Sequence, residues 1–170
     1  MRTRILAHRF SALLPVIAIS TLAALAEPSG NAGFEKLKSL AGTWEAKHED
    51  GSATTVTYKV VSGGSAIVET ISYGKEPEAM VTMYHLDGSK LMLTHYCGAG
   101  NQPRMVAKPS ADPNKLTFAY LDATNLKSPD DGHMNGLTVT FEGPDSITQA
   151  WAWKANGKES TDVFKYHRLK

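Results

Sequence analysis

The chain has 170 residues, and its 18 basic and 17 acidic side chains give a formal net charge of +1. This balance excludes the strong positive charge that binding to nucleic acid or to an anionic membrane surface usually requires. Hydrophobic residues make up 42% of the sequence, which is typical of a globular domain and too high for a disordered chain. Cys97 is the only cysteine, so the chain has no intrachain disulfide and no cysteine-rich zinc module.

Residues 1–26 have the three-part layout of a secretory signal peptide. An arginine-rich start precedes an apolar run at 10–25, which ends in a small-x-small pattern at 24–26 that a signal peptidase can cleave. The alternative is a membrane anchor, but the run is shorter than a span of ~20 residues and Pro15 interrupts it. We therefore expect cleavage, no membrane span in the mature protein, and a periplasmic or secreted bacterial location.

A short helix is expected directly after a polar linker at residues 27–33. Phe34, Leu37 and Leu40 are three positions apart, which places them on one face of a helix, and Gly42 ends it. No later segment has the pattern of a long amphipathic helix, so parallel βαβ folds are excluded.

Residues 34–170 are predicted to form one all-β domain, because hydrophobicity after the helix alternates with a period of two between recurring turn residues. The expected strands cover residues 43–49, 53–61, 65–73, 79–86, 90–97, 104–108, 115–121, 135–142, 146–154 and 161–169. Closing about ten antiparallel strands into an up-and-down barrel would leave no open edge, and a two-sheet sandwich is the alternative. Two longer loops, at 98–103 and 122–134, are the expected places for function.

Strand alternation predicts which side chains enter the barrel. The Gly63-Gly64 turn places Tyr58 opposite Glu69, on a face that Val56, Val60, Ile67 and Ile71 make apolar. Glu69 is therefore an expected buried carboxylate, which must be hydrogen-bonded or protonated.

The same alternation points His95 and Cys97 inward from strand 90–97, and groups Gln149 with Trp151 and Trp153 on strand 146–154. The side of the sheet on which His85 lies depends on the length of the Asp87-Gly88 turn. The pattern leaves both registers open.

The sequence LAGTW at residues 40–44 resembles the Gly-x-Trp opening of lipocalin-like (calycin) barrels. In that group an arginine on the closing strand commonly packs on the tryptophan. The resemblance therefore implies a structural contact between Arg168 and Trp44, a cation–π pair worth ~1 kcal/mol.

Three further segments resemble a family of uncharacterised bacterial lipocalin-like proteins: MVTMYHLDG at 80–88, LTHYC at 93–97 and GNQPRM at 100–105. The resemblance implies a small barrel with a pocket and no established reaction. The related nitrobindins bind haem through a histidine on the last strand. Here Asp162 and Phe164 occupy the interior-type positions, and His167 lies on the alternate face, so no cofactor is expected.

Several polar or aromatic residues are candidates for a ligand site in the barrel or at its open end. They are Tyr58, Glu69, His95, Cys97, Asn101, Gln102, Arg104, Gln149 and Trp151. Histidine exchanges protons near neutral pH, and arginine or glutamine can hold an anionic or carbonyl oxygen. Alternatively, Asn101, Gln102 and Arg104 form a hydrogen-bond network that anchors their loop.

A metal site at His95 and Cys97 is disfavoured, because two ligands do not make a site and a core histidine beside a small buried thiol is the simpler interpretation. Catalytic signatures such as Gly-x-Ser-x-Gly and His-Glu-x-x-His are absent from the sequence. We expect a binding protein for a small apolar or amphipathic molecule, with Glu69, His95, Arg104 and Gln149 fixing its polar end. The alternatives are a small enzyme that uses His95 or Glu69 as a proton carrier, and a protein-interaction module with a filled barrel.

Overall fold

A computed structural model describes residues 31–74 and 76–170 as a closed barrel of ten antiparallel strands with one short helix. The expected signal peptide and most of the expected linker lie outside the described residues. The elements are α1 (Ala32–Lys38), β1 (Gly42–Lys47), β2 (Ala53–Val61), the 3-10 turn η1 (Ser62–Gly64), β3 (Ala66–Tyr73), β4 (Glu76–Asp87), β5 (Lys90–Tyr96), β6 (Gln102–Lys108), β7 (Lys115–Thr124), β8 (His133–Gly143), β9 (Ser146–Ala155) and β10 (Lys158–Arg168).

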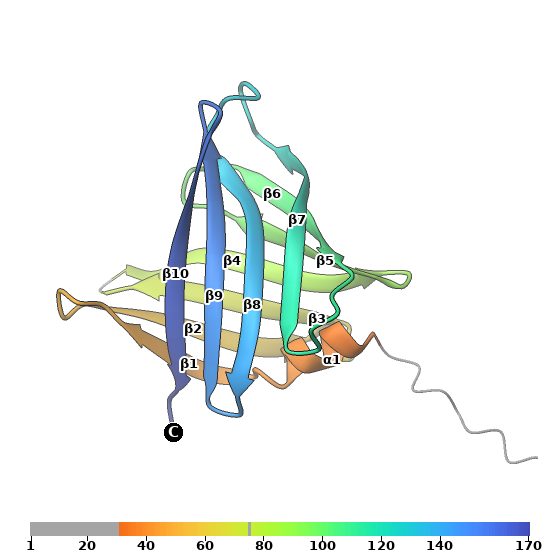
Figure 1. The fold of residues 1–170 in the computed structure, drawn as a ribbon, viewed down its shortest axis with the longest axis vertical. Helices are drawn as coiled ribbons and strands as arrows, with labels where there is room; N and C mark the ends of the chain where they lie inside the picture. Colours follow the sequence, from red (N-terminus) through yellow and green to blue (C-terminus); the bar gives the residue numbers. More distant parts are fainter. Residues whose placement is uncertain (1–30, 75) are drawn as a thin grey trace, which may run out of the picture.

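Each strand pairs with the next along the chain, and β10 returns to pair with β1, which closes the sheet. Strands β8 to β10 stand upright on one side, while β2 to β4 cross behind them at a steep angle (Figure 1). The predicted up-and-down barrel is confirmed, and the sandwich alternative is wrong.

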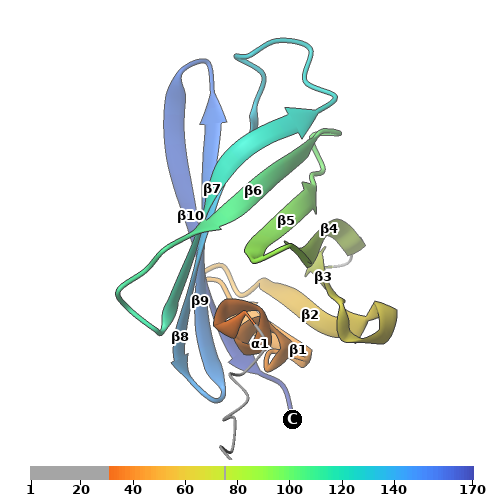
Figure 2. The same cartoon turned by 90° about the vertical axis from the view of Figure 1, so that its right-hand side faces the viewer.

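Helix α1 lies at one end of the barrel, beside β1 and β2 (Figure 2). The Asn31 side chain caps it by accepting a hydrogen bond from the Phe34 amide, so the helix begins at Ala32, two residues before the expected start. Phe34, Leu37 and Leu40 are all buried in the main hydrophobic core, as their spacing predicts.

The expected contact between Trp44 and Arg168 is present at this end. The Arg168 guanidinium carbon lies 4.1 Å from the centre of the Trp44 ring, and the Trp44 indole donates to the Leu40 carbonyl at 2.8 Å. Arg168 also donates to the carbonyls of Ala41 and Ser39, at 2.8 and 3.0 Å. These bonds fasten the segment between α1 and β1 to the closing strand.

The predicted register of β2 and β3 is confirmed, with Tyr58 opposite Glu69 and Val56 opposite Ile71. Val60 departs from the expected buried face: it is 37% exposed, because it lies near the turn where the two strands leave the core.

The register of β4 and β5 settles the position of His85. Asp87 pairs with Lys90, so His85 lies opposite Met92 and on the other face of the sheet from His95.

The two long loops are shorter than expected. Strand β6 begins at Gln102, β7 continues to Thr124 and β8 begins at His133, so each loop loses residues to the strands beside it. Beyond the pairing of Ala119 with Gly136, the upper part of β7 curves away from β8 (Figure 1). The two strands thus separate at the end of the barrel opposite α1, which we call the open end.

Candidate functional site

A row of polar side chains crosses the barrel interior on neighbouring strands. Tyr58 on β2, Glu69 on β3, Thr82 on β4 and His95 on β5 are successive cross-strand partners, so strand alternation turns all four inward. None of the four is more than 2% exposed. The row therefore places a carboxylate and an imidazole in the interior, with one threonine between them.

Glu69 is the centre of a buried hydrogen-bond cluster. Its Oε2 accepts from the Tyr84 hydroxyl at 2.7 Å and from Gln149 Nε2 at 3.0 Å, and Gln149 Nε2 lies 2.6 Å from the Tyr58 hydroxyl. Burial raises the pKa of the Glu69 carboxyl, although hydrogen bonds from Tyr84, Tyr58, Gln149 and Thr82 oppose the shift. No cationic side chain in the described part of the chain forms an ion pair with Glu69. Neutral donors alone stabilise this carboxylate.

The two tyrosines remain neutral; Tyr84 donates to Glu69, and Tyr58 accepts from Gln149. Burial and the nearby Glu69 charge raise the pKa values of Tyr58 and Tyr84 well above the ordinary tyrosine value. Glu69 is consequently the most acidic group of this cluster, and it is fully buried.

His95 has one satisfied and one unsatisfied ring nitrogen. Its Nδ1 lies 2.9 Å from Thr82 Oγ1, whereas Nε2 has no hydrogen-bond partner among residues 31–74 and 76–170. Its ring is tilted against the Trp151 ring at 4.7 Å between centroids. Burial lowers the pKa of His95 to about 4, so the imidazole is neutral at physiological pH. An unpaired buried nitrogen costs free energy, which makes Nε2 the outstanding feature of the site.

A small cavity adjoins His95 at the open end of the barrel. Its volume is about 30 Å³, enough for one or two water molecules or the polar head of a ligand. Its lining residues are Ile71, Tyr73, Met80, His95, Met134, Trp151, Asp162 and Phe164. Asp162 is exposed, which places it at the rim. Most of the wall is therefore apolar or aromatic, with His95 as the buried polar group.

The structure brings together five of the residues that the sequence singled out. Tyr58, Glu69 and Gln149 form the buried cluster, His95 lies beside it, and Trp151 joins them by donating its indole N–H to Gln149 Oε1 at 3.1 Å. Of these five, His95 and Trp151 line the cavity.

The positions of Arg104 and Cys97 differ from those expected for residues of a ligand site. Arg104 is exposed on the outer face, where Nε donates to Asp122 Oδ1 at 2.6 Å, because the buried side chains of β6 are its neighbours Pro103 and Met105. The prediction that Arg104 fixes the polar end of the barrel is therefore wrong. Cys97 follows the last residue of β5 and lies half-buried in a turn, with its sulfur 3.5 Å from the Ala99 amide. Strand alternation does not extend to it.

Asn101 and Gln102 anchor the loops, as the alternative interpretation holds. Asn101 is 4% exposed and donates to the Gly132 carbonyl at 2.8 Å, which links the two loops of the open end. Gln102 accepts from the Thr124 hydroxyl at 2.6 Å. Neither residue lines the cavity beside His95.

Thr82 and Tyr84 are site residues that the sequence reasoning missed. Both are inward-facing residues of β4 with no exposed surface, and Met80 of the same strand lines the cavity. The signal was available in the alternation Met80, Thr82, Tyr84, because a threonine within an otherwise apolar inward face must have a buried partner.

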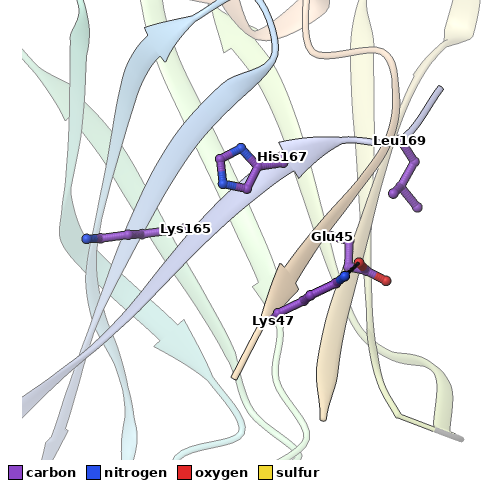
Figure 3. A pocket seen from close by; sticks show the side chains of 5 residues that line it. All are labelled: Glu45, Lys47, Lys165, His167 and Leu169. Atoms are coloured by element: carbon purple, nitrogen blue, oxygen red, sulfur yellow. Dashed lines mark ion pairs between the residues drawn. The ribbon is translucent and has the colours of Figure 1, made fainter. Parts of the chain in front are cut away.

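A larger hollow lies on the outer face of the barrel, between β1 and β10. It measures about 430 Å³ and is lined by Glu45, Lys47, Lys165, His167 and Leu169. Figure 3 shows Lys47 beside Glu45, and Lys165 directed away from them. These side chains are exposed or half-buried, and the described residues place no unsatisfied buried polar atom there, unlike at His95. His167, the histidine of the last strand, thus faces outward.

No three His, Cys, Asp or Glu side chains of residues 31–74 and 76–170 converge in a way that could hold a metal ion. Within the same residues, no helix has the length and apolar character needed to cross a bilayer.

Comparison with known proteins shows that the fold resembles those of two solved structures. No protein-family model and no curated protein matches the sequence. The crystal structure of Rv2717c from M. tuberculosis is similar, with a TM-score of 0.54 and 15% identity over 83% of this chain and 99% of that chain. A protein of unknown function from the DUF3598 family of Nostoc punctiforme gives a TM-score of 0.52 and 12% identity over 78% of this chain. The matched region is 49% of that protein, so this chain spans about half its length. At these identities the likeness shows the barrel fold alone.

Proposed function

We propose that the protein binds a small, largely apolar molecule at the open end of its barrel, with the polar group of that molecule on His95. The observation that carries this proposal is the unsatisfied Nε2 of a fully buried imidazole beside a cavity with mostly apolar walls. A ligand hydrogen bond would remove the cost of that unpaired nitrogen, and the aromatic and aliphatic walls would hold the apolar body.

A bound ligand larger than a few atoms requires side chains to move, because the cavity of about 30 Å³ is small. Met80 and Met134 are only half-buried, and methionine adapts its shape to irregular partners at low cost. Barrels of about this strand number can hold one small ligand. The head of the ligand would therefore enter the cavity while its body displaces the methionines of the rim.

The proposal is tested in two steps. Native mass spectrometry of the protein purified from its own source should reveal a mass that travels with the chain. A titration with phenol, followed by NMR at the Trp151 indole N–H, should then shift that resonance saturably, because the Trp151 ring contacts His95.

A matched pair of variants separates binding from general damage. His95→Gln removes the imidazole and should weaken phenol binding about tenfold. His133→Gln also replaces a buried histidine, but His133 bonds to the Asp131 carbonyl and lies outside the cavity lining, so phenol binding should be retained. Equal binding by wild type and His95→Gln would refute the proposed position of the ligand.

A protein-interaction module is the second candidate, because a large cluster of buried side chains occupies the interior of the described barrel. Leu121 and Val163, which are 51% and 56% exposed, would then be contact residues. An enzyme that uses Glu69 as a proton carrier has less support, since Glu69 does not line the cavity. Absence of any small-molecule binding, together with a stable complex formed through Leu121, would favour the interaction module.

We also propose that the protein is exported to the periplasm or beyond. The support is the basic, apolar and small-residue layout of residues 1–26. Fractionation of the source cells and mass measurement of the purified N-terminus test this. An intact N-terminus on protein in the cytoplasmic fraction would overturn it.

A further inference from the structure

The position of the proton on His95 follows from its neighbours in the interior. Thr82 lies between two groups: Glu69 is its cross-strand partner on β3, and His95 its partner on β5. A threonine hydroxyl has one hydrogen to donate and can also accept. The carboxylate can only accept, whereas His95 Nδ1 can donate or accept according to its tautomer. The donor and acceptor roles of Glu69, Thr82 and His95 therefore depend on which of the two neighbours accepts the hydrogen of the Thr82 hydroxyl.

In its ionised form the Glu69 carboxyl is the stronger acceptor of the two, because a hydrogen bond to an ionised oxygen is stronger than one to a neutral nitrogen. Glu69 Oε1 is buried and has no hydrogen-bond partner in the described residues, and Thr82 is the residue opposite Glu69 on the neighbouring strand β4. With its hydrogen directed to Glu69, Thr82 Oγ1 offers a lone pair to His95 across the 2.9 Å separation from Nδ1. Nδ1 must then carry the imidazole proton.

We infer that Glu69 is ionised and accepts the Thr82 hydrogen, that His95 therefore presents an unprotonated Nε2 to the cavity, and that the molecule bound there carries a hydrogen-bond donor, a hydroxyl or N–H group, on its apolar body. This inference rests on the proposed function and names its ligand class. A ketone, ether or ester oxygen would face the nitrogen lone pair and gain nothing.

The charged side chains around the cavity limit the charge that the ligand can carry. Asp162 lies at the rim, opposite Trp151 in the strand register, and Glu69 is separated from His95 by Thr82 in the row of cross-strand partners. No arginine or lysine is among the lining residues, all of which belong to the described chain. A carboxylate or phosphate ligand would therefore meet negative charge without a cation to pair with. The ligand expected here is a neutral alcohol, phenol or N–H heterocycle.

The first experiment reads the tautomer directly. Nitrogen-15 NMR of the ligand-free protein near neutral pH should show His95 Nδ1 as the protonated nitrogen and Nε2 as the unprotonated one. Thr82→Ser keeps the hydroxyl and should keep this tautomer, whereas Thr82→Val should lose the preference. Because the wild-type spectrum alone answers the question, the test does not depend on the stability of the valine variant. Protonation at Nε2 in the wild type would overturn the inference.

The second experiment compares probes of nearly equal shape. Phenol and fluorobenzene differ in the donor group, and cyclohexanol and cyclohexanone form an independent aliphatic pair. Phenol and cyclohexanol should bind wild type about tenfold or more tightly than their partners, because an unmatched buried acceptor is costly. Thr82→Ser should preserve this preference.

The outcomes separate the two proposals. Equal affinity within each pair would overturn the inference on ligand class while leaving small-molecule binding in place. Failure of all four probes to bind, with the tautomer as inferred, would overturn the proposed function, and the ligand class would fall with it. A preference for cyclohexanone over cyclohexanol would show that Nε2 donates, which contradicts the inference directly.

Discussion

Gln149 on β9 donates a hydrogen bond across the barrel to the Tyr58 hydroxyl on β2, at 2.6 Å, although 91 positions separate them in the sequence. The same amide nitrogen reaches Glu69 Oε2 at 3.0 Å, so strands on opposite sides of the interior share one polar cluster. Such a cluster stabilises the fold only while every member keeps its partners. Its members should therefore respond to substitution as a unit.

Glu69→Ala should destabilise the protein by about 4 kcal/mol, because it leaves Tyr84 and Gln149 without their acceptor and opens a cavity. Glu69→Gln keeps the volume and one accepting oxygen, so its cost should be about 1 kcal/mol. Urea denaturation of both variants measures the difference. Glu49→Ala, at an exposed carboxylate in the turn after β1, serves as the control and should change stability by about 0.5 kcal/mol or less. Similar losses for the two Glu69 variants would contradict the role of Glu69 as an acceptor.

Acid should destabilise the protein through His95. Its pKa is about 4 in the folded protein against an ordinary value of 6.5, so the unfolded chain binds the extra proton first. This contribution to stability is complete above pH 6.5, falls as the pH drops toward 4, and amounts to about 3 kcal/mol.

The histidine contribution is isolated by comparison with His95→Gln. Glu69 acts in the opposite direction, since its raised pKa makes the folded state gain stability as the pH falls. Because both proteins contain Glu69, the difference in unfolding free energy between them should fall by about 3 kcal/mol from pH 6.5 to pH 4. A difference that stays constant over this range would show that His95 is not buried as a neutral group.

Arg168→Lys should cost about 2 kcal/mol, because lysine cannot reproduce the planar contact with Trp44 and the two carbonyl hydrogen bonds together. Arg104→Lys is the matched control: its ion pair with Asp122 is 47% exposed on both sides, so the loss should be about 1 kcal/mol or less. Thermal unfolding monitored by circular dichroism ranks the two variants. A larger loss of stability for Arg104→Lys than for Arg168→Lys would contradict this prediction.

Gly132→Ala should destabilise the open end of the barrel. A Cβ atom at Gly132 would overlap the six-membered ring of Trp153, so the expected cost is about 2 kcal/mol. Gly143→Ala is the control, since nothing lies within 4 Å of a Cβ atom there and its expected effect is about 0.5 kcal/mol or less. Hydrogen exchange of β8 and β9 amides would locate the change. Unaltered exchange near Trp153 would show that the ring moves aside without cost.

Much of the fold could be predicted from local pattern. The alternation of Val56, Tyr58 and Ile71 with polar neighbours specifies the inward faces, and the Gly63-Gly64 turn specifies their register. The helix face of Phe34, Leu37 and Leu40 follows from spacing alone. Cys97 was misplaced because strand alternation ends at Tyr96, the last residue of β5. Arg104 was misplaced because it was grouped with the loop before it, whereas it lies inside β6 and alternation turns it outward between the buried Pro103 and Met105.

The amino-acid sequence by itself determined the strand period, the turns and the presence of an ionisable pair, Glu69 and His95, on inward faces. Only the closed barrel decided their environment. Ring closure brings Gln149 to Tyr58 and Glu69, aligns Thr82 between the carboxylate and the imidazole, and leaves Nε2 facing a small cavity. The physical reason is that hydrophobic period and turn geometry act over a few residues, whereas the pairing of buried polar atoms depends on contacts between strands far apart in the chain.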